Sequence, residues 1–188
     1  MHQALYILEN LYPAPENGTV ILQTAPWHAL RSAGKKDYSS GSVNYKLSGN
    51  YVTNVGSLSY YYHPPIFNRS RIWQIIRTSW FEKIITADID LYLGIIRTIA
   101  RETHQSGSKL LIAFIKASEY RFHPFCQWDN PSLMDELSSI ADGFVDVTLA
   151  ETREALDPKF YLHEYDQHPS ALANEVRAKL IQKAMEDL

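Results

Sequence analysis

An aspartate and a histidine lie two residues apart just before the last predicted helix. They are Asp166 and His168, in the segment Asp-Gln-His-Pro-Ser. A neutral imidazole can take a proton from a hydroxyl group, and a nearby carboxylate fixes its tautomer and stabilises the imidazolium that forms. The pair can therefore supply the acid–base half of a hydrolase site. By itself the spacing more often marks a polar loop that caps a helix, with the histidine at the surface.

The same segment contains enough ligand-type side chains for a divalent metal. His163, Glu164, Asp166 and His168 supply four within six residues. Their spacing is irregular, however, and the chain has neither an HExxH motif nor a pair of cysteines. We therefore predict no metal ligands and keep a metal-dependent hydrolase as an alternative hypothesis. Phosphate-binding and dinucleotide-binding glycine patterns are also absent, so no cofactor is predicted.

Two further polar residues follow the first predicted strand. His28 could orient a substrate or donate to an oxyanion, and Arg31 could bind a carboxylate or hydroxyl group. In the alternative interpretation Trp27 packs, His28 is half exposed and Arg31 pairs with an acidic residue. The polar residues from Lys116 onward, which follow a later strand, do not differ from an ordinary surface loop.

No nucleophile matches this acid–base pair. The sequence lacks both a Gly-x-Ser-x-Gly elbow and a Gly-Asp-Ser strand end. Ser39, Ser40 and Ser42 lie in a predicted hairpin segment, which is a poor rigid platform. Cys126 follows His123 by three residues but lacks an orienting partner, so a structural thiol is the better interpretation.

The composition predicts one globular domain over residues 1–188. The net charge is −3, so no field of one sign indicates nucleic acid as a partner. A single cysteine excludes an intrachain disulfide framework. No apolar run approaches the roughly 20 residues that span a bilayer. No signal peptide is predicted after Met1, but a missing N-terminus could carry one, and the compartment is not assigned.

Helical and strand patterns alternate along the chain. Continuous apolar runs predict buried strands at 19–23, 109–115 and 143–147. Helical spacing predicts helices from the start of the chain to Leu11 and over 70–85, 88–105, 129–141 and 169–186. In the last helix we expect Leu172, Val176, Leu180 and Ile181 to face inward. A β-hairpin insertion is predicted around 43–54.

This alternation favours an α/β fold with a parallel sheet. In such open sheets ligands bind beyond the carboxyl ends of the strands. Residues 24–31, 116–125 and 148–168 are therefore the expected lining of a site.

The order of features resembles the SGNH/GDSL hydrolase family. The strongest match is the block from Asp166 to Asn174, which leads into a helix. The strand beginning Gly107-Ser108-Lys109 looks like the family's penultimate strand. The segment 20–31 resembles its third block, in a bacterial subgroup where His-x-x-Arg replaces Gly-x-Asn-Asp. The Asp-x-His spacing is one residue shorter than the family's Asp-x-x-His.

The resemblance implies a three-layer α/β/α sandwich with a flavodoxin-like sheet. It also implies ester or acyl hydrolysis in which a serine attacks, His168 relays the proton and Asp166 holds His168. The family's serine and oxyanion-glycine blocks are not found, so we expect a fragment lacking its first strand, through truncation, a misplaced start or excerpting. The expected partner is a small-molecule or carbohydrate ester. The alternative is a non-catalytic domain of the same fold that binds carbohydrate or protein.

Overall fold

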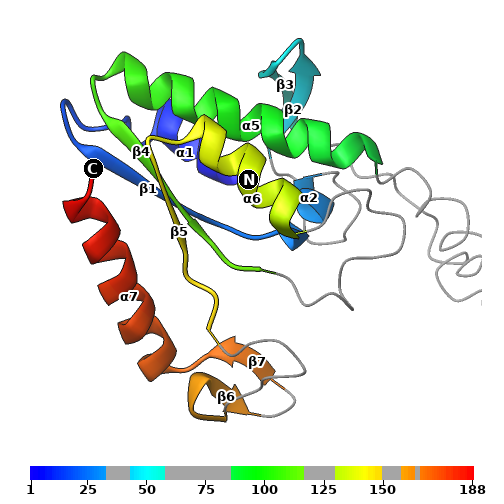
Figure 1. The fold of residues 1–188 in the computed structure, drawn as a ribbon. Helices are drawn as coiled ribbons and strands as arrows, with labels where there is room; N and C mark the ends of the chain where they lie inside the picture. Colours follow the sequence, from blue (N-terminus) through cyan, green and yellow to red (C-terminus); the bar gives the residue numbers. More distant parts are fainter. Residues whose placement is uncertain (33–42, 58–85, 117–129, 150–157, 164–165) are drawn as a thin grey trace, which may run out of the picture. The chain divides into compact units, whose positions relative to one another are not determined.

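The computed structural model describes residues 1–32, 43–57, 86–116, 130–149, 158–163 and 166–188 (Figure 1). The chain divides into two compact units, which are described one at a time. One comprises residues 1–13, 27–99 and 123–127, and the other comprises 14–26, 100–122 and 128–188. The helix predicted over 70–85 lies outside the described residues.

The second unit is built on a parallel sheet of three strands. These are β1 (Thr19–Thr24), β4 (Lys109–Phe114) and β5 (Gly143–Asp146), in the order β1-β4-β5. All three predicted strands and their parallel arrangement are confirmed. Positions 110–114 of β4, the central strand, are all buried, and because successive side chains point to opposite faces of the sheet, this strand is covered on both faces. A central parallel strand therefore reads as an unbroken apolar run.

Helices precede and follow these strands. α5 (Thr86–Gln105) leads into β4, and α6 (Asn130–Ile140) connects β4 to β5. α6 contacts both strands, and its buried residues are Leu133 and Leu137. None of the helices in the described part of the chain is long and apolar enough to cross a membrane.

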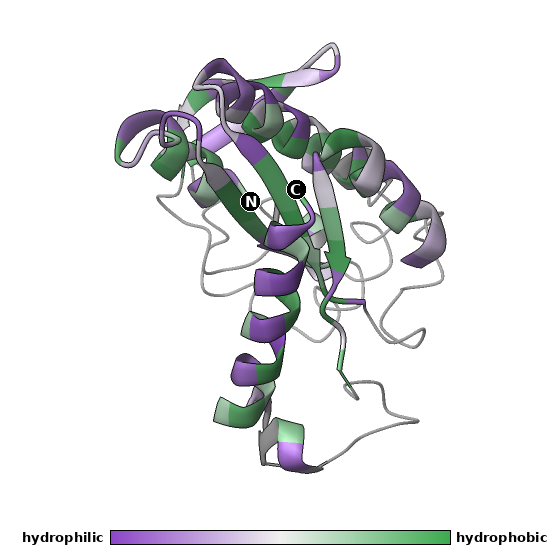
Figure 2. Cartoon of the chain, turned by 60° about the vertical axis from the view of Figure 1, so that its left-hand side comes forward, coloured by the Kyte–Doolittle hydropathy of each residue, from purple (hydrophilic) through white to green (hydrophobic). Residues whose placement is uncertain are grey.

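α7 (Ala171–Glu186) contacts β5 and β4 and runs antiparallel to them (Figure 1). Arg177, six residues after the start of α7, reaches the end of β5, and Leu188, just beyond the end of the helix, meets the first residues of β4 and β5. The predicted inward position of Leu172 was wrong, since 42% of this residue is exposed. The buried residues are Ala173 and Arg177, one helical turn apart. Figure 2 accordingly shows α7 with hydrophilic and hydrophobic residues interspersed.

A short hairpin precedes α7. A 3-10 helix (η5, Pro158–Phe160) leads into β6 (Tyr161–His163), which pairs antiparallel with β7 (Asp166–Pro169). Asp166 and His168 were predicted in a loop, and this was wrong because both lie in β7. Proline restricts the preceding residue to extended backbone, which explains the strand conformation at His168.

The first unit contains α1 (His2–Asn10), α2 (Trp27–Ser32) and the hairpin of β2 (Val43–Ser48) with β3 (Tyr51–Ser57). It also includes α5 up to residue 99. The hairpin confirms the prediction for 43–54. Its turn begins at Gly49, whose φ of 61° is the conformation that glycine adopts without strain.

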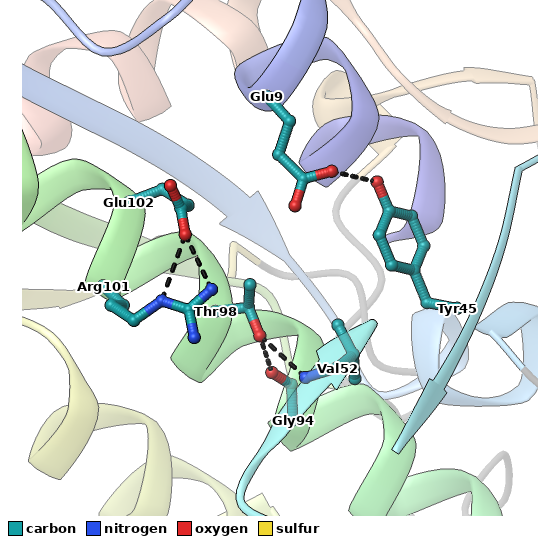
Figure 3. Close-up of polar contacts among 7 residues, drawn as sticks. All are labelled: Glu9, Tyr45, Val52, Gly94, Thr98, Arg101 and Glu102. Carbon is teal, nitrogen blue, oxygen red and sulfur yellow. Dashed lines mark hydrogen bonds and ion pairs between the residues drawn. The ribbon is translucent and has the colours of Figure 1, made fainter. Parts of the chain in front are cut away.

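Buried polar contacts hold the hairpin in place (Figure 3). The Tyr45 hydroxyl donates to Glu9 of α1 over 2.5 Å. The pKa of the Tyr45 phenol is raised, mainly by burial and secondly by this hydrogen bond to Glu9. Thr98 of α5 accepts the Val52 N–H at 3.0 Å and donates to the Gly94 carbonyl at 2.8 Å. The hydroxyl thus satisfies a backbone group of β3 and fixes it against α5.

Candidate functional site

Three polar residues meet where β4 and β5 end. Lys116 Nζ lies 2.6 Å from Asp146 Oδ2, and the Lys116 N–H donates to Thr148 Oγ1 over 2.8 Å. The Thr148 N–H in turn donates to Asp146 Oδ1 over 2.9 Å. All three are partly buried. They form a closed set of contacts, here called the carboxyl-edge cluster, that joins the two strand ends.

The cluster holds Asp146 in its ionised form. Burial alone would raise the pKa of this carboxyl group. Hydrogen bonds from Lys116 and Thr148, together with the lysine charge, outweigh burial and hold the pKa below its ordinary value. Asp146 is therefore an anion near neutral pH, fixed at the edge of the sheet where ligands of open α/β folds bind.

Val147 is fixed between these residues. Its N–H donates to the Phe114 carbonyl over 2.8 Å, which extends the pairing of β4 with β5. Its carbonyl accepts a hydrogen bond of 3.2 Å from Arg177 Nε of α7. Arg177 is only 6% exposed, and burial lowers the pKa of its guanidinium. A buried arginine thus joins α7 to the carboxyl end of β5.

The direction of α7 determines where His168 lies along the sheet. The helix starts at Ala171, six residues before Arg177, and a rise of about 1.5 Å per residue makes this about 9 Å. Its other end meets the starts of β4 and β5. The segment before Ala171 therefore extends past the carboxyl ends of the strands. His168 is in that segment and its side chain is exposed.

The start of α7 is held by Ser170. This residue caps the helix, because the Ser170 hydroxyl accepts the Ala173 N–H over 3.2 Å. It also donates to the Lys159 carbonyl over 2.7 Å, and the Ser170 N–H donates to the Phe160 carbonyl over 2.9 Å. The residue two positions after His168 is thus hydrogen-bonded both to α7 and to η5.

Asp166 and His168 both lie in strand β7, two residues apart. The side chain of Asp166 lies outside the described residues. Among the side chains that the structure does describe, no group of three or more His, Cys, Asp or Glu residues could hold a metal. Of the cluster at 163–168, only the His168 side chain is described.

His28 and Arg31 both lie in α2, which belongs to the first unit. The sequence predicted strand-end loop residues here, and the structure places them on a short helix. The His28 ring packs edge-on against Trp27, with ring centroids 6.0 Å apart. His28 is partly buried, and the side chain of Arg31 lies outside the described part of the chain.

The expected lining, residues 116–125 and 148–168, includes Lys116 and Thr148 of the carboxyl-edge cluster. Sequence reasoning did not distinguish Lys116 from an ordinary polar loop, however, and it did not single out Asp146 or Arg177. A signal was present for Asp146, because an acid at the end of the apolar run Gly-Phe-Val-Asp-Val requires a partner if it is to stay charged. For Arg177 the pattern was misleading, since charged residues of amphipathic helices are usually exposed.

Comparisons with protein-family models, with curated proteins and with solved structures found no match to this chain.

Proposed function

We propose that this chain is an acyl hydrolase of the SGNH type that carries the His-Asp part of a Ser-His-Asp site, with His168 as the general base and a serine that the sequence motifs do not identify as the nucleophile. In this mechanism His168 takes the proton from a serine hydroxyl as the oxygen attacks the ester carbonyl. Asp166 stabilises the resulting imidazolium, and His168 then passes the proton to the leaving alcohol. A water molecule repeats the sequence to release the acid.

The observation that carries this proposal is the direction of α7. Because Arg177 meets the end of β5 and Leu188 meets its start, the segment with His168 extends past the carboxyl edge of the sheet. That edge is where open α/β folds bind their ligands. An exposed imidazole there is accessible to a substrate, whereas one at the opposite edge would lie away from it.

The proposal includes a three-layer α/β/α arrangement around the parallel sheet. It is supported by β4, which is buried at five consecutive positions, and by the contacts that α6 and α7 each make with β4 and β5. A strand buried on both faces needs covering layers on both sides.

Hydrolysis of p-nitrophenyl acetate tests the role of His168. Removal of a general base typically lowers the rate by about 10²–10⁴-fold, so we expect His168→Gln to abolish most of the activity. His104→Gln is the matched control, because His104 pairs with Asp142 before the start of β5, at the opposite edge of the sheet. Failure of the wild-type chain to hydrolyse the ester, or full activity in His168→Gln, would refute the proposal.

Labelling with a fluorophosphonate probe, followed by peptide mapping, identifies the nucleophile. We expect one serine to react in the wild type and to react much more slowly in His168→Gln, because the base activates the hydroxyl. A folded chain that neither labels nor hydrolyses esters would instead be a non-catalytic binding domain.

A further inference from the structure

We propose that Arg177 is a positioning residue that holds His168 at the carboxyl edge of the sheet. The effect of Arg177 on catalysis rests on the proposed function, but its effect on the position of His168 can be tested without an activity assay. The inference starts from one contact, the hydrogen bond from Arg177 Nε to the Val147 carbonyl.

The acceptor of this hydrogen bond is rigidly held. Val147 lies between Asp146 and Thr148, and both of these are bound to Lys116 at the end of β4. The Val147 N–H is itself bonded to Phe114 of β4. A donor attached to this carbonyl is therefore fixed relative to two strands at once.

The donor is equally restricted. Arg177 is on the buried face of α7, one turn after Ala173, which is fully buried. The small alanine lets the helix approach the sheet, and the long arginine reaches the strand end. An apolar residue at 177 could fill the same space, but it could not fix a direction, because the hydrophobic effect is non-directional. A hydrogen bond from a charged donor is directional and strong.

Arg177 transmits this restraint to His168 through a short and stiff path. Six residues of helix, about 9 Å, separate it from Ala171. The Ser170 cap then ties the helix start to Lys159 and Phe160. The other end of α7 is held separately, since the Leu188 carbonyl accepts from Lys109 Nζ. Without Arg177, the first turns of α7 would lose their polar anchor on β5 while the far end stayed in place.

Side-chain NMR of histidine tests this directly. The imidazole C–H signals of His168 and His104 are assigned with the His→Gln variants and then compared in Arg177→Met, Arg177→Lys and Lys179→Met. Lys179→Met is the matched control, because Lys179 is on the same helix but exposed and paired only within it, to Glu175. Methionine at 177 preserves apolar volume, and replacement of a buried charge in this way often keeps the fold.

We expect Arg177→Met to shift the His168 signals at constant pH and to leave those of His104 unchanged. Arg177→Lys should restore them partly, because lysine keeps a donor but not the guanidinium geometry. Lys179→Met should change neither. If folded Arg177→Met has the same His168 signals as Lys179→Met, the inference is overturned. If Arg177→Met does not fold, the His168 signals of Arg177→Lys are compared with those of Lys179→Met instead, and identical signals overturn the inference.

Activity separates this inference from the proposed function. In an active chain, Arg177→Met should lower kcat at least about tenfold with KM within about twofold, because a misplaced base affects the chemical step more than binding. An unchanged kcat in folded Arg177→Met would show that Arg177 does not support catalysis by positioning His168. A wild-type chain without esterase activity would refute the proposed function, and the NMR comparison would still decide whether Arg177 positions His168.

Discussion

The imidazole Nε2 of His104, near the end of α5, lies 2.7 Å from Oδ2 of Asp142, the residue immediately before β5. The same carboxylate oxygen accepts the N–H of Leu110 in β4 over 2.7 Å. One side chain therefore joins the end of a helix and the starts of two parallel strands. Asp142 therefore links α5, β4 and β5 through polar contacts at the amino-terminal ends of these two strands.

Replacement of Asp142 should destabilise the second unit. Asp142→Ala leaves the Leu110 N–H without its acceptor and removes the hydrogen bond with His104, so we expect a loss of about 1–3 kcal/mol in the free energy of unfolding. Asp142→Asn keeps a carbonyl oxygen that can accept from Leu110 and should cost less. Urea denaturation of both variants checks this order. Equal losses in the two variants would mean that the charge, and not the acceptor, is what matters.

Asp142 should also make folding sensitive to acid. Burial opposes its ionisation, but the Leu110 N–H, His104 and Lys109 outweigh burial and lower the pKa of the folded carboxyl below the ordinary value of 3.8. A depressed folded pKa gives stability that is complete above the unfolded value and is lost as the pH falls through the folded value. We expect wild-type stability to fall more steeply than that of Asp142→Asn below about pH 4. Parallel curves in urea titrations at pH 5 and below would contradict this.

Much of the sheet could be predicted because its strands are short apolar runs buried in a parallel arrangement. Thr19–Thr24, Lys109–Phe114 and Gly143–Asp146 each match the expected strand within two residues at either end. The β2–β3 hairpin could also be predicted, because Gly49 marks its turn. β6 and β7 were missed because both are short and contain polar residues, and because β7 ends in a proline.

The candidate site was only partly predictable. His168 was identified from its residue type and from the helix that follows it. Asp146 and Arg177 were not, because their importance arises from the register of β5 against β4 and the rotation of α7. The rotation of α7 was misjudged by one position, since Leu172 was expected inside where Ala173 is. A shift of one residue, about 100°, changes which side chain meets the strand end.

Two buried threonines of α5 should respond in opposite ways to the same substitution. Thr98 and Thr103 are both fully buried. Thr98 bonds both Val52 and Gly94, so Thr98→Val leaves the Val52 N–H unpaired and should cost about 1–3 kcal/mol. The Thr103 hydroxyl has no hydrogen-bond partner among the described residues, so Thr103→Val should be neutral or stabilising. Thermal unfolding of both variants tests this. A similar loss of stability in each would show that the loss does not come from the hydrogen bonds of the Thr98 hydroxyl.

Ser170 should contribute to stability as a helix cap. Ser170→Ala removes the acceptor for Ala173 and the donor to Lys159, so we expect a loss of about 1–2 kcal/mol. Ser170→Thr keeps the hydroxyl and is the control. Hydrogen exchange measured by mass spectrometry should show faster exchange in the first turn of α7 for Ser170→Ala only. Equal exchange in the two variants would exclude a capping role.

Gly107, which follows α5, should tolerate alanine less well than Gly49 in the hairpin turn. Both have positive φ, 74° and 61°, so alanine at either position costs about 1–2 kcal/mol in backbone strain. At Gly107 an added Cβ would also lie 2.8 Å from Asn17 Oδ1, whereas at Gly49 no other part of the described chain lies within 4 Å. Gly107→Ala must therefore displace the Asn17 side chain. The Asn17 backbone is itself restrained, because its φ is 54° and its N–H donates to the Ser106 carbonyl.

We expect the loss of unfolding free energy for Gly107→Ala, measured by urea denaturation, to exceed that for Gly49→Ala by about 1 kcal/mol, in line with the cost of overpacking. Equal losses would mean that Asn17 moves aside freely and that only the backbone conformation requires glycine.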